Sequence, residues 1–138
     1  MYPEEIVIPM KEELTENGFS ELLTADAVEK ALAEKGTTLV MINSVCGCSA
    51  GTARPGVLMA VSNTAKKPDQ ITTTFAGFDI EAVKKLREHL LPYPPSSPAI
   101  ALFKDGQLVH FIERHNIEGR SARMIADNLI GAFDQYCN

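Results

Sequence analysis

The chain has 138 residues, 45% of them hydrophobic, which suffices for one core and falls short of two typical domains. We therefore expect a single domain over residues 1–138. A net charge of −5 without a basic stripe argues against nucleic acid as a partner. No apolar run reaches the roughly 20 residues that cross a bilayer, and the first residues do not resemble a signal peptide, so we expect a cytoplasmic protein with no membrane partner.

The first half of the chain predicts a helix, a buried strand and a second helix. Residues 24–36 place apolar side chains on one face, with Thr24 as a cap and Gly36 just beyond the end. The run "TTLVMIN" that follows is β-branched and apolar, as expected of a strand covered on both faces. Residues 49–62 then suit a helix packed closely on a sheet, and Pro55 is expected to kink it.

The second half predicts a strand, a helix, a hairpin and a last helix. Residues 70–76 form the strand, and the helix that follows begins at Asp79 as a cap and stops before Pro92. The segments "AIALF" and "QLVHFI" flank the turn "KDG", which indicates an antiparallel hairpin. Ser121 opens the last helix, whose inward face is assigned to four residues: Met124, Ile125, Leu129 and Phe133. This order predicts an α/β fold, a mixed sheet of about four strands with helices on both faces.

The motif Cys46-Gly47-Cys48 follows the first buried strand, at the carboxyl end where ligand chemistry gathers in such sheets. A cysteine reacts as its thiolate, and the open N–H groups of a helix starting near Cys48 favour negative charge on Cys46. We therefore expect the pKa of Cys46 to be lowered and the pKa of Cys48 not to be lowered. Asn43 and Ser44 are candidates for further hydrogen bonds, whereas Arg54 is expected to point away along the helix, leaving no definite cation near the motif.

The paired thiols are compatible with redox chemistry, with a metal site or with a purely structural role. Paired cysteines in a cytoplasmic protein are more often catalytic or metal-binding than structural. A metal site would join Cys46 and Cys48 to Cys137, His110 or His115, although zinc sites favour wider cysteine spacing. Two inert buried thiols, in a plain interaction module, form the third alternative. Redox chemistry ranks first, because glycine between two cysteines at a helix start is an exposed arrangement.

Four segments in the same order resemble the bacilliredoxins, thioredoxin-like proteins of bacteria that make bacillithiol: "NSVCGCSAGTARPG", "PSSPAIALFKDG", "VHFIERHNIEGRS" and "AFDQYCN". The resemblance runs over nearly the whole chain. It implies a thioredoxin-like fold and thiol–disulfide exchange, especially removal of bacillithiol from oxidised, S-thiolated proteins, with Cys46 as nucleophile. Bacillithiol or another low-molecular-weight thiol would be the co-substrate, with no bound cofactor and no metal. A disulfide isomerase type of activity is an alternative.

The resemblance also implies a cis peptide bond between Ser97 and Pro98, facing the reactive cysteine, where the Ser97 backbone would pair with an extended substrate. Cys137 continues the inward face of the last helix, so it is either a small buried hydrophobic residue or a thiol that resolves an adduct on Cys46. We favour Cys48 as the resolving thiol.

The remaining polar candidates fit ordinary structural roles. His89 ends an amphipathic helix, and His110 occupies the polar face of a strand. The run Glu113-Arg114-His115 is interpreted as a salt-bridged strand end, and no general base is assigned.

Overall fold

Strand β2 (Thr37–Asn43) lies at the centre of a five-stranded sheet, and all seven of its residues are buried. The computed structural model describes residues 1–138. The sheet order is β1-β3-β2-β4-β5, with β2 parallel to β3 and antiparallel to β4. The other strands are β1 (Ser20–Glu21), β3 (Gln70–Phe75), β4 (Ala99–Lys104) and β5 (Gln107–Ile112). The predicted α/β arrangement is confirmed, with one more strand than expected.

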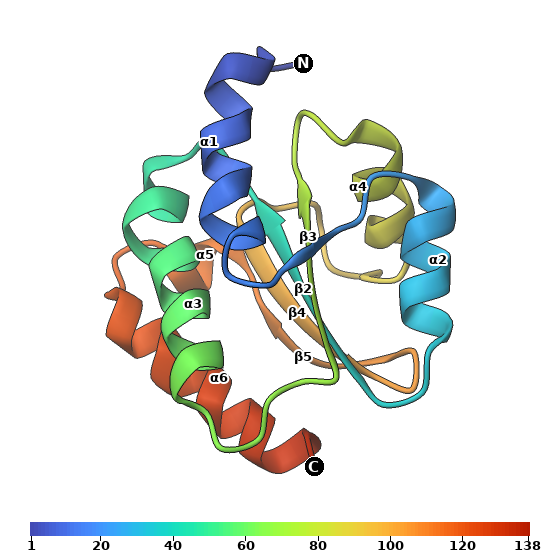
Figure 1. The fold of residues 1–138 in the computed structure, drawn as a ribbon, viewed down its shortest axis with the longest axis vertical. Helices are drawn as coiled ribbons and strands as arrows, with labels where there is room; N and C mark the ends of the chain where they lie inside the picture. Colours follow the sequence, from blue (N-terminus) through green and yellow to red (C-terminus); the bar gives the residue numbers. More distant parts are fainter.

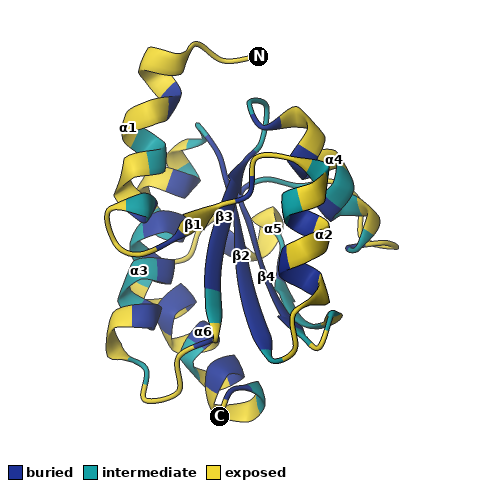
Figure 2. Cartoon of the chain, turned by 45° about the vertical axis from the view of Figure 1, so that its right-hand side comes forward, coloured by how far each residue is buried: buried dark blue, intermediate teal, exposed yellow.

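Two helical layers enclose the sheet (Figure 1). One consists of α1 (Glu4–Thr15), the π-helical segment η1 (Ser49–Ala53), α3 (Arg54–Asn63), α5 (Arg114–Ile117) and α6 (Ala122–Tyr136). The other consists of α2 (Ala25–Ala33) and α4 (Ile80–Glu88). Leu39 and Met41 of β2 join the first core, and Val40 and Ile42 join the second. This alternation explains the unbroken apolar run, because each face of the strand has its own layer of helices. Figure 2 shows the buried strands between the two layers.

Three elements carry no clear sequence signal. Strand β1 is two exposed residues that pair with β3, so only tertiary pairing makes it a strand. Helix α1 contains Pro9 and buries only Val7 and Leu14, which weakens the helical pattern. The one-turn helix α5 is held by a capping box in which Glu113 and Asn116 bond each other's backbone N–H groups.

Several local predictions need correction. Met124 is 49% exposed and does not belong to the inward face of α6, which keeps the other three predicted residues and also includes Ala126 and Ala132. Asp79 precedes α4 but makes no capping bond; its carboxylate instead accepts from the Phe75 N–H and pairs with Lys11. Pro55 lies in the first turn of α3, where its missing N–H is tolerated, and the irregularity is the π-helical segment before it.

The hairpin agrees with its sequence signal. Asp105 has φ 50° and Gly106 has φ 78°, the left-handed pair that a tight two-residue hairpin turn requires. The Asp105 carboxylate also accepts a hydrogen bond from the Gly36 N–H, 2.8 Å away, which ties the turn to the start of β2.

Candidate functional site

The two cysteines of the motif lie in the connection from β2 to η1, at the carboxyl end of the central strand, as predicted. Both side chains are partly exposed and both thiols are free. The helical turn begins at residues 47–48, and the Cys46 carbonyl accepts from the Ser49 N–H at 2.9 Å. The motif is therefore a strand end that turns directly into a helix, with Cys46 just before the first open N–H groups.

The backbone supplies a hydrogen bond to the first thiol. The Cys48 N–H donates to Cys46 Sγ across 3.4 Å. A helix start favours a negatively charged sulfur in this geometry, because the backbone N–H points directly at the sulfur atom. Ser44 and Asn43, proposed as partners of the thiol, bond the loop instead: Ser44 Oγ accepts from the Cys46 N–H at 3.1 Å.

The two thiols differ in acidity in the direction predicted from the sequence. A hydrogen bond from the Cys48 side chain, the Cys48 N–H and the positive charge of Arg114 together lower the pKa of Cys46, against the effect of burial. Burial, followed by donation of its proton to Cys46, raises the pKa of Cys48. Of the two thiols, Cys46 therefore ionises first, and Cys48 keeps its proton and donates it toward Cys46.

A cation that the sequence analysis missed faces the motif. Arg114, which the sequence pattern placed in a salt-bridged strand end, lies close enough for its charge to help lower the pKa of Cys46 and to oppose in part the raised pKa of Cys48. Its Nη1 donates to the Ser97 carbonyl at 3.3 Å, and its Nε bonds the Glu118 carboxylate at 2.7 Å. It comes from α5, nearly 70 residues beyond the motif, so no local pattern could have placed it there.

Arg54 does not point away, as expected, but lies buried beneath the loop, with 2% of its side chain exposed. Its Nη1 donates to Asn43 Oδ1 at 2.8 Å and to the Ser44 carbonyl at 2.9 Å. Its Nε lies 3.0 Å from a carboxylate oxygen of Glu13 on α1. Asn43 Nδ2 in turn donates to the Met10 carbonyl of α1. Arg54 therefore fixes the segment that presents Cys46 by joining β2, η1 and α1.

The peptide bond between Ser97 and Pro98 is cis, as predicted. Pro98 is buried directly before β4, while Ser97 is partly exposed. The Ser97 carbonyl accepts from Arg114, the residue whose charge acts on the two cysteines. The loop before β4 and the start of α5 thus lie together beside the motif. A second cis bond, between Leu91 and Pro92, was not predicted.

Cys137 follows the last turn of α6 and is buried in the core, as predicted, but it lies far from the motif. It bonds the side chain of Thr37 at the beginning of β2, and burial raises its pKa. Cys46 lies beyond the other end of that seven-residue strand, which spans ~20 Å. The C-terminus and the β2–α3 connection accordingly lie at opposite ends of the molecule in Figure 1. A disulfide requires Cα atoms within about 7 Å, so this fold does not bring Cys137 to Cys46.

The residues considered for a metal site are not brought together. No group of three or more His, Cys, Asp or Glu side chains forms in the structure. Of these candidates, His110 bonds Asn128 at 2.7 Å. His115 is exposed. The arrangement therefore does not support the metal-binding alternative.

None of the helices has the length and apolar composition needed to cross a membrane.

Comparison with known proteins gives relatives over the whole chain. The sequence profile of a family described as disulphide isomerase matches residues 2–137. A bacilliredoxin of Cytophaga hutchinsonii is 60% identical over 135 residues, which is 98% of this chain and 99% of that protein. A bacilliredoxin of Salinibacter ruber is 52% identical, over 99% of this chain and 81% of that protein.

Solved structures of low sequence identity share the fold. Mitochondrial thioredoxin 3 of Saccharomyces cerevisiae in its oxidised form has a TM-score of 0.59 at 14% identity, over 89% of this chain and 98% of that one. A mutant thioredoxin of Halobacterium salinarum has a TM-score of 0.60 at 15% identity, over 88% and 93%. The fold is therefore thioredoxin-like, as the sequence resemblance implied.

Proposed function

Because this chain belongs to the bacilliredoxin family and has a thioredoxin-like fold, we propose that it removes bacillithiol from mixed disulfides on oxidised proteins. Family and fold make it a redox protein of the thiol–disulfide oxidoreductase type. The substrate, the low-molecular-weight thiol and the role of each cysteine are our proposal. The observation that carries it is the Cys48 N–H aimed at Cys46 Sγ, together with the opposite pKa shifts of the two thiols.

The first step uses Cys46 as the nucleophile. Its thiolate attacks the bacillithiol sulfur of the mixed disulfide, so that a bond forms between Cys46 Sγ and that sulfur while the disulfide bond between that sulfur and the cysteine sulfur of the client breaks. The client leaves as a thiolate and takes a proton from water. A lowered pKa supports this role, because the thiolate is the reacting form and is abundant at neutral pH only when the pKa is reduced.

The second step uses Cys48 as the resolving thiol. Once it loses its proton, Cys48 Sγ attacks Cys46 Sγ, bacillithiol leaves as a thiol, and the two cysteines form a disulfide. A thiol reductant restores the dithiol by the same exchange. Cys48 is favoured over Cys137, because Cys48 is next to Cys46 and Cys137 lies at the other end of β2. Free thiols of this kind suit a reducing compartment, and we propose the cytoplasm.

The loop before β4 and Arg114 would position the client. In the proposal, the partly exposed Ser97 backbone beside the buried Pro98 pairs with an extended segment of the oxidised protein. Arg114, which donates to the Ser97 carbonyl, is well placed to attract the negative charge that develops on the departing sulfur.

The test is transfer of the adduct. A reporter protein with one bacillithiol-modified cysteine is incubated with the chain, and mass spectrometry follows the modification. We expect it to appear on Cys46, to persist in Cys48→Ser and to be lost in Cys46→Ser, while Cys137→Ser behaves as wild type. Transfer that survives in Cys46→Ser, or none in the wild type, would contradict the proposal.

Disulfide isomerase activity is a second candidate, favoured by the description of the matching family. An isomerase rearranges disulfides in a scrambled client without net reduction. Recovery of activity of a scrambled ribonuclease, with no low-molecular-weight thiol present, separates the two functions, since bacillithiol removal predicts little recovery under that condition.

A further inference from the structure

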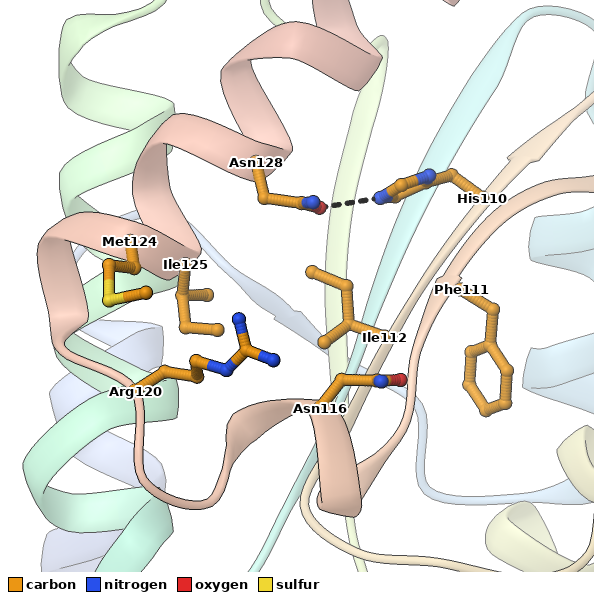
Figure 3. Close-up of a pocket in the computed structure, with 8 residues that line it drawn as sticks. All are labelled: His110, Phe111, Ile112, Asn116, Arg120, Met124, Ile125 and Asn128. Carbon is orange, nitrogen blue, oxygen red and sulfur yellow. Dashed lines mark hydrogen bonds between the residues drawn. The ribbon is translucent and has the colours of Figure 1, made fainter.

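A hollow lies between the start of α6, the loop before it and strand β5. Its volume is about 300 Å³, which is at the lower end for pockets that hold small ligands. Figure 3 shows Arg120 and Asn116 from the α5 region, His110 from β5 and Asn128 from α6 around it. Ile112 and the 49% exposed Met124 form part of its apolar wall. None of the features that the mechanism uses lines this hollow.

The polar side chains of this pocket have free hydrogen-bond donors, because the amide oxygens of its two asparagines already accept hydrogen bonds. Asn128 Oδ1 lies 2.7 Å from His110 Nε2, so the Asn128 amide NH₂ is left to donate. Asn116 Oδ1 accepts from the Glu113 N–H at 3.1 Å, which likewise leaves its NH₂. The Arg120 guanidinium makes no ion pair and no side-chain hydrogen bond, and it points into the space between α6 and β5 (Figure 3).

The charge of the pocket is the reverse of the chain's. No Asp or Glu lines it, although the whole chain carries a net charge of −5. Every other arginine of the chain has a partner for its side chain: Arg54, Arg114 and Arg123 each pair with a carboxylate, and Arg87 donates to a carbonyl. A guanidinium and two amide NH₂ groups around one small volume match a carboxylate, which accepts two parallel N–H bonds from arginine.

The pocket is joined to the cysteine loop by short connections. Helix α5 holds Arg114 toward the two cysteines, and two residues later Asn116 lines the pocket. Thr52 of η1, six residues after Cys46, donates its hydroxyl to the Arg120 carbonyl at 3.0 Å.

We infer that this pocket binds the carboxylate of the low-molecular-weight thiol whose sulfur is transferred to Cys46. The inference rests on the proposed function, because it assigns a place for the non-reacting part of the same co-substrate. The sulfur lies at Cys46, and the carboxylate lies against Arg120 with the two amides. The pocket therefore selects acidic small thiols over neutral ones of the same size.

A matched pair of thiols tests the selection. N-acetylcysteine and N-acetylcysteamine differ by one carboxylate, and each is loaded onto the same single-cysteine reporter protein. The ratio of kcat/KM for the acidic adduct to that for the neutral adduct is measured. We expect Arg120→Gln to lower this ratio about five- to tenfold, the effect of one charge-assisted hydrogen-bond pair at an exposed site. Comparing ratios cancels the different intrinsic reactivity of the two adducts.

Arg123→Gln is the control, because Arg123 lies on α6 but pairs with Asp127 and does not line this pocket. It should leave the ratio unchanged. An unchanged ratio in Arg120→Gln, or a ratio that falls only in Arg114→Gln, would overturn the inference, since selection would then occur at the cysteines or not at all.

A binding measurement separates failure of the pocket from failure of the proposed function. In Cys46→Ser, which cannot exchange, NMR follows the Arg120 Nε–H and the Asn116 and Asn128 side-chain amides during titration with each free thiol. We expect N-acetylcysteine to shift these resonances and N-acetylcysteamine to leave them unchanged. In Arg120→Gln, N-acetylcysteine should no longer shift the Asn116 and Asn128 amide resonances. Shifts without any turnover by the wild type would contradict the proposed function alone, and turnover without shifts would contradict the pocket alone.

Discussion

Replacing Arg54 by methionine removes the side chain that holds the Cys46 loop in place. Arg54 Nη1 donates to Asn43 Oδ1 and to the Ser44 carbonyl at 2.8 and 2.9 Å, from a side chain that is 2% exposed. In the variant, Asn43 Oδ1 still accepts from the Ser44 N–H and the Ser49 hydroxyl, so the missing arginine bond costs this oxygen little free energy. The Ser44 carbonyl loses its charged donor inside the protein. We expect Arg54→Met to lower the free energy of unfolding by about 2–4 kcal/mol.

That loss is large enough to measure and small enough for the variant to remain folded. A protein of 138 residues is stable by ~7–20 kcal/mol, so the variant should still fold. An unfolding entropy of ~0.3 kcal/mol per kelvin converts the loss into a fall in Tm of about 7–14 °C. Calorimetry or circular dichroism measures it. Alkylation of Cys46 at pH 7 gives the second readout, and it should slow because the loop no longer holds Cys46 against the Cys48 N–H.

Two further variants make the reasoning refutable. Arg54→Lys keeps the positive charge but loses the planar guanidinium with its several N–H donors, so its Tm should fall less than that of Arg54→Met. Glu13→Gln removes only a partner that is 45% exposed, and should cost no more than about 1 kcal/mol. If Arg54→Met melts within about 2 °C of the wild type and its Cys46 reacts at the wild-type rate, Arg54 does not hold the loop.

Four other outcomes follow from the site and its packing. Cys48→Ala should move the rise of the Cys46 alkylation rate to higher pH than Cys48→Ser does, because only serine keeps a side-chain donor to the thiolate; equal profiles would show that the side-chain bond is unimportant. Arg114→Gln should also raise the pKa of Cys46, so that Cys46 is alkylated more slowly at pH 7 and its alkylation rate rises only at higher pH. This increase in pKa should be larger at low salt than at high salt. Cys137→Ser should leave bacillithiol transfer unchanged but lower Tm, since it puts a hydroxyl into the core; loss of transfer with an intact fold would make Cys137 functional. Gly56→Ala should destabilise by about 1–3 kcal/mol in chemical denaturation, because its Cβ would lie 2.8 Å from a side-chain carbon of α6, and an unchanged midpoint would mean that the two helices separate easily.

Much of the fold was predictable because its signals are local. The apolar run of β2, the cap of Thr24 on α2 and the Asp105-Gly106 turn each depend on residues a few positions apart. The start of a helix after a buried strand likewise placed Cys46 at the carboxyl edge of the sheet and gave the direction of its pKa shift. Physical chemistry acts here over one turn or one strand, so the sequence carries it directly.

The remaining features depend on contacts between distant segments. Met124 and the outer face of α6 follow from how that helix lies on the sheet, and β1 exists only because β3 pairs with it. The sequence could not show that Arg114 turns toward the cysteines while Arg54 folds beneath them, since a charged side chain in a local pattern is most often solvated.

The sequence by itself therefore determined the chemistry that this protein can perform: two thiols, one glycine apart, at the junction of a buried strand and a helix. Only the tertiary structure decided which groups lie near those thiols. Packing brought α5 and the loop before β4 to the motif and put Cys137 at the far end of β2. The physical reason is that a thiolate responds to charges and donors within a few ångströms in space, whatever their distance along the chain.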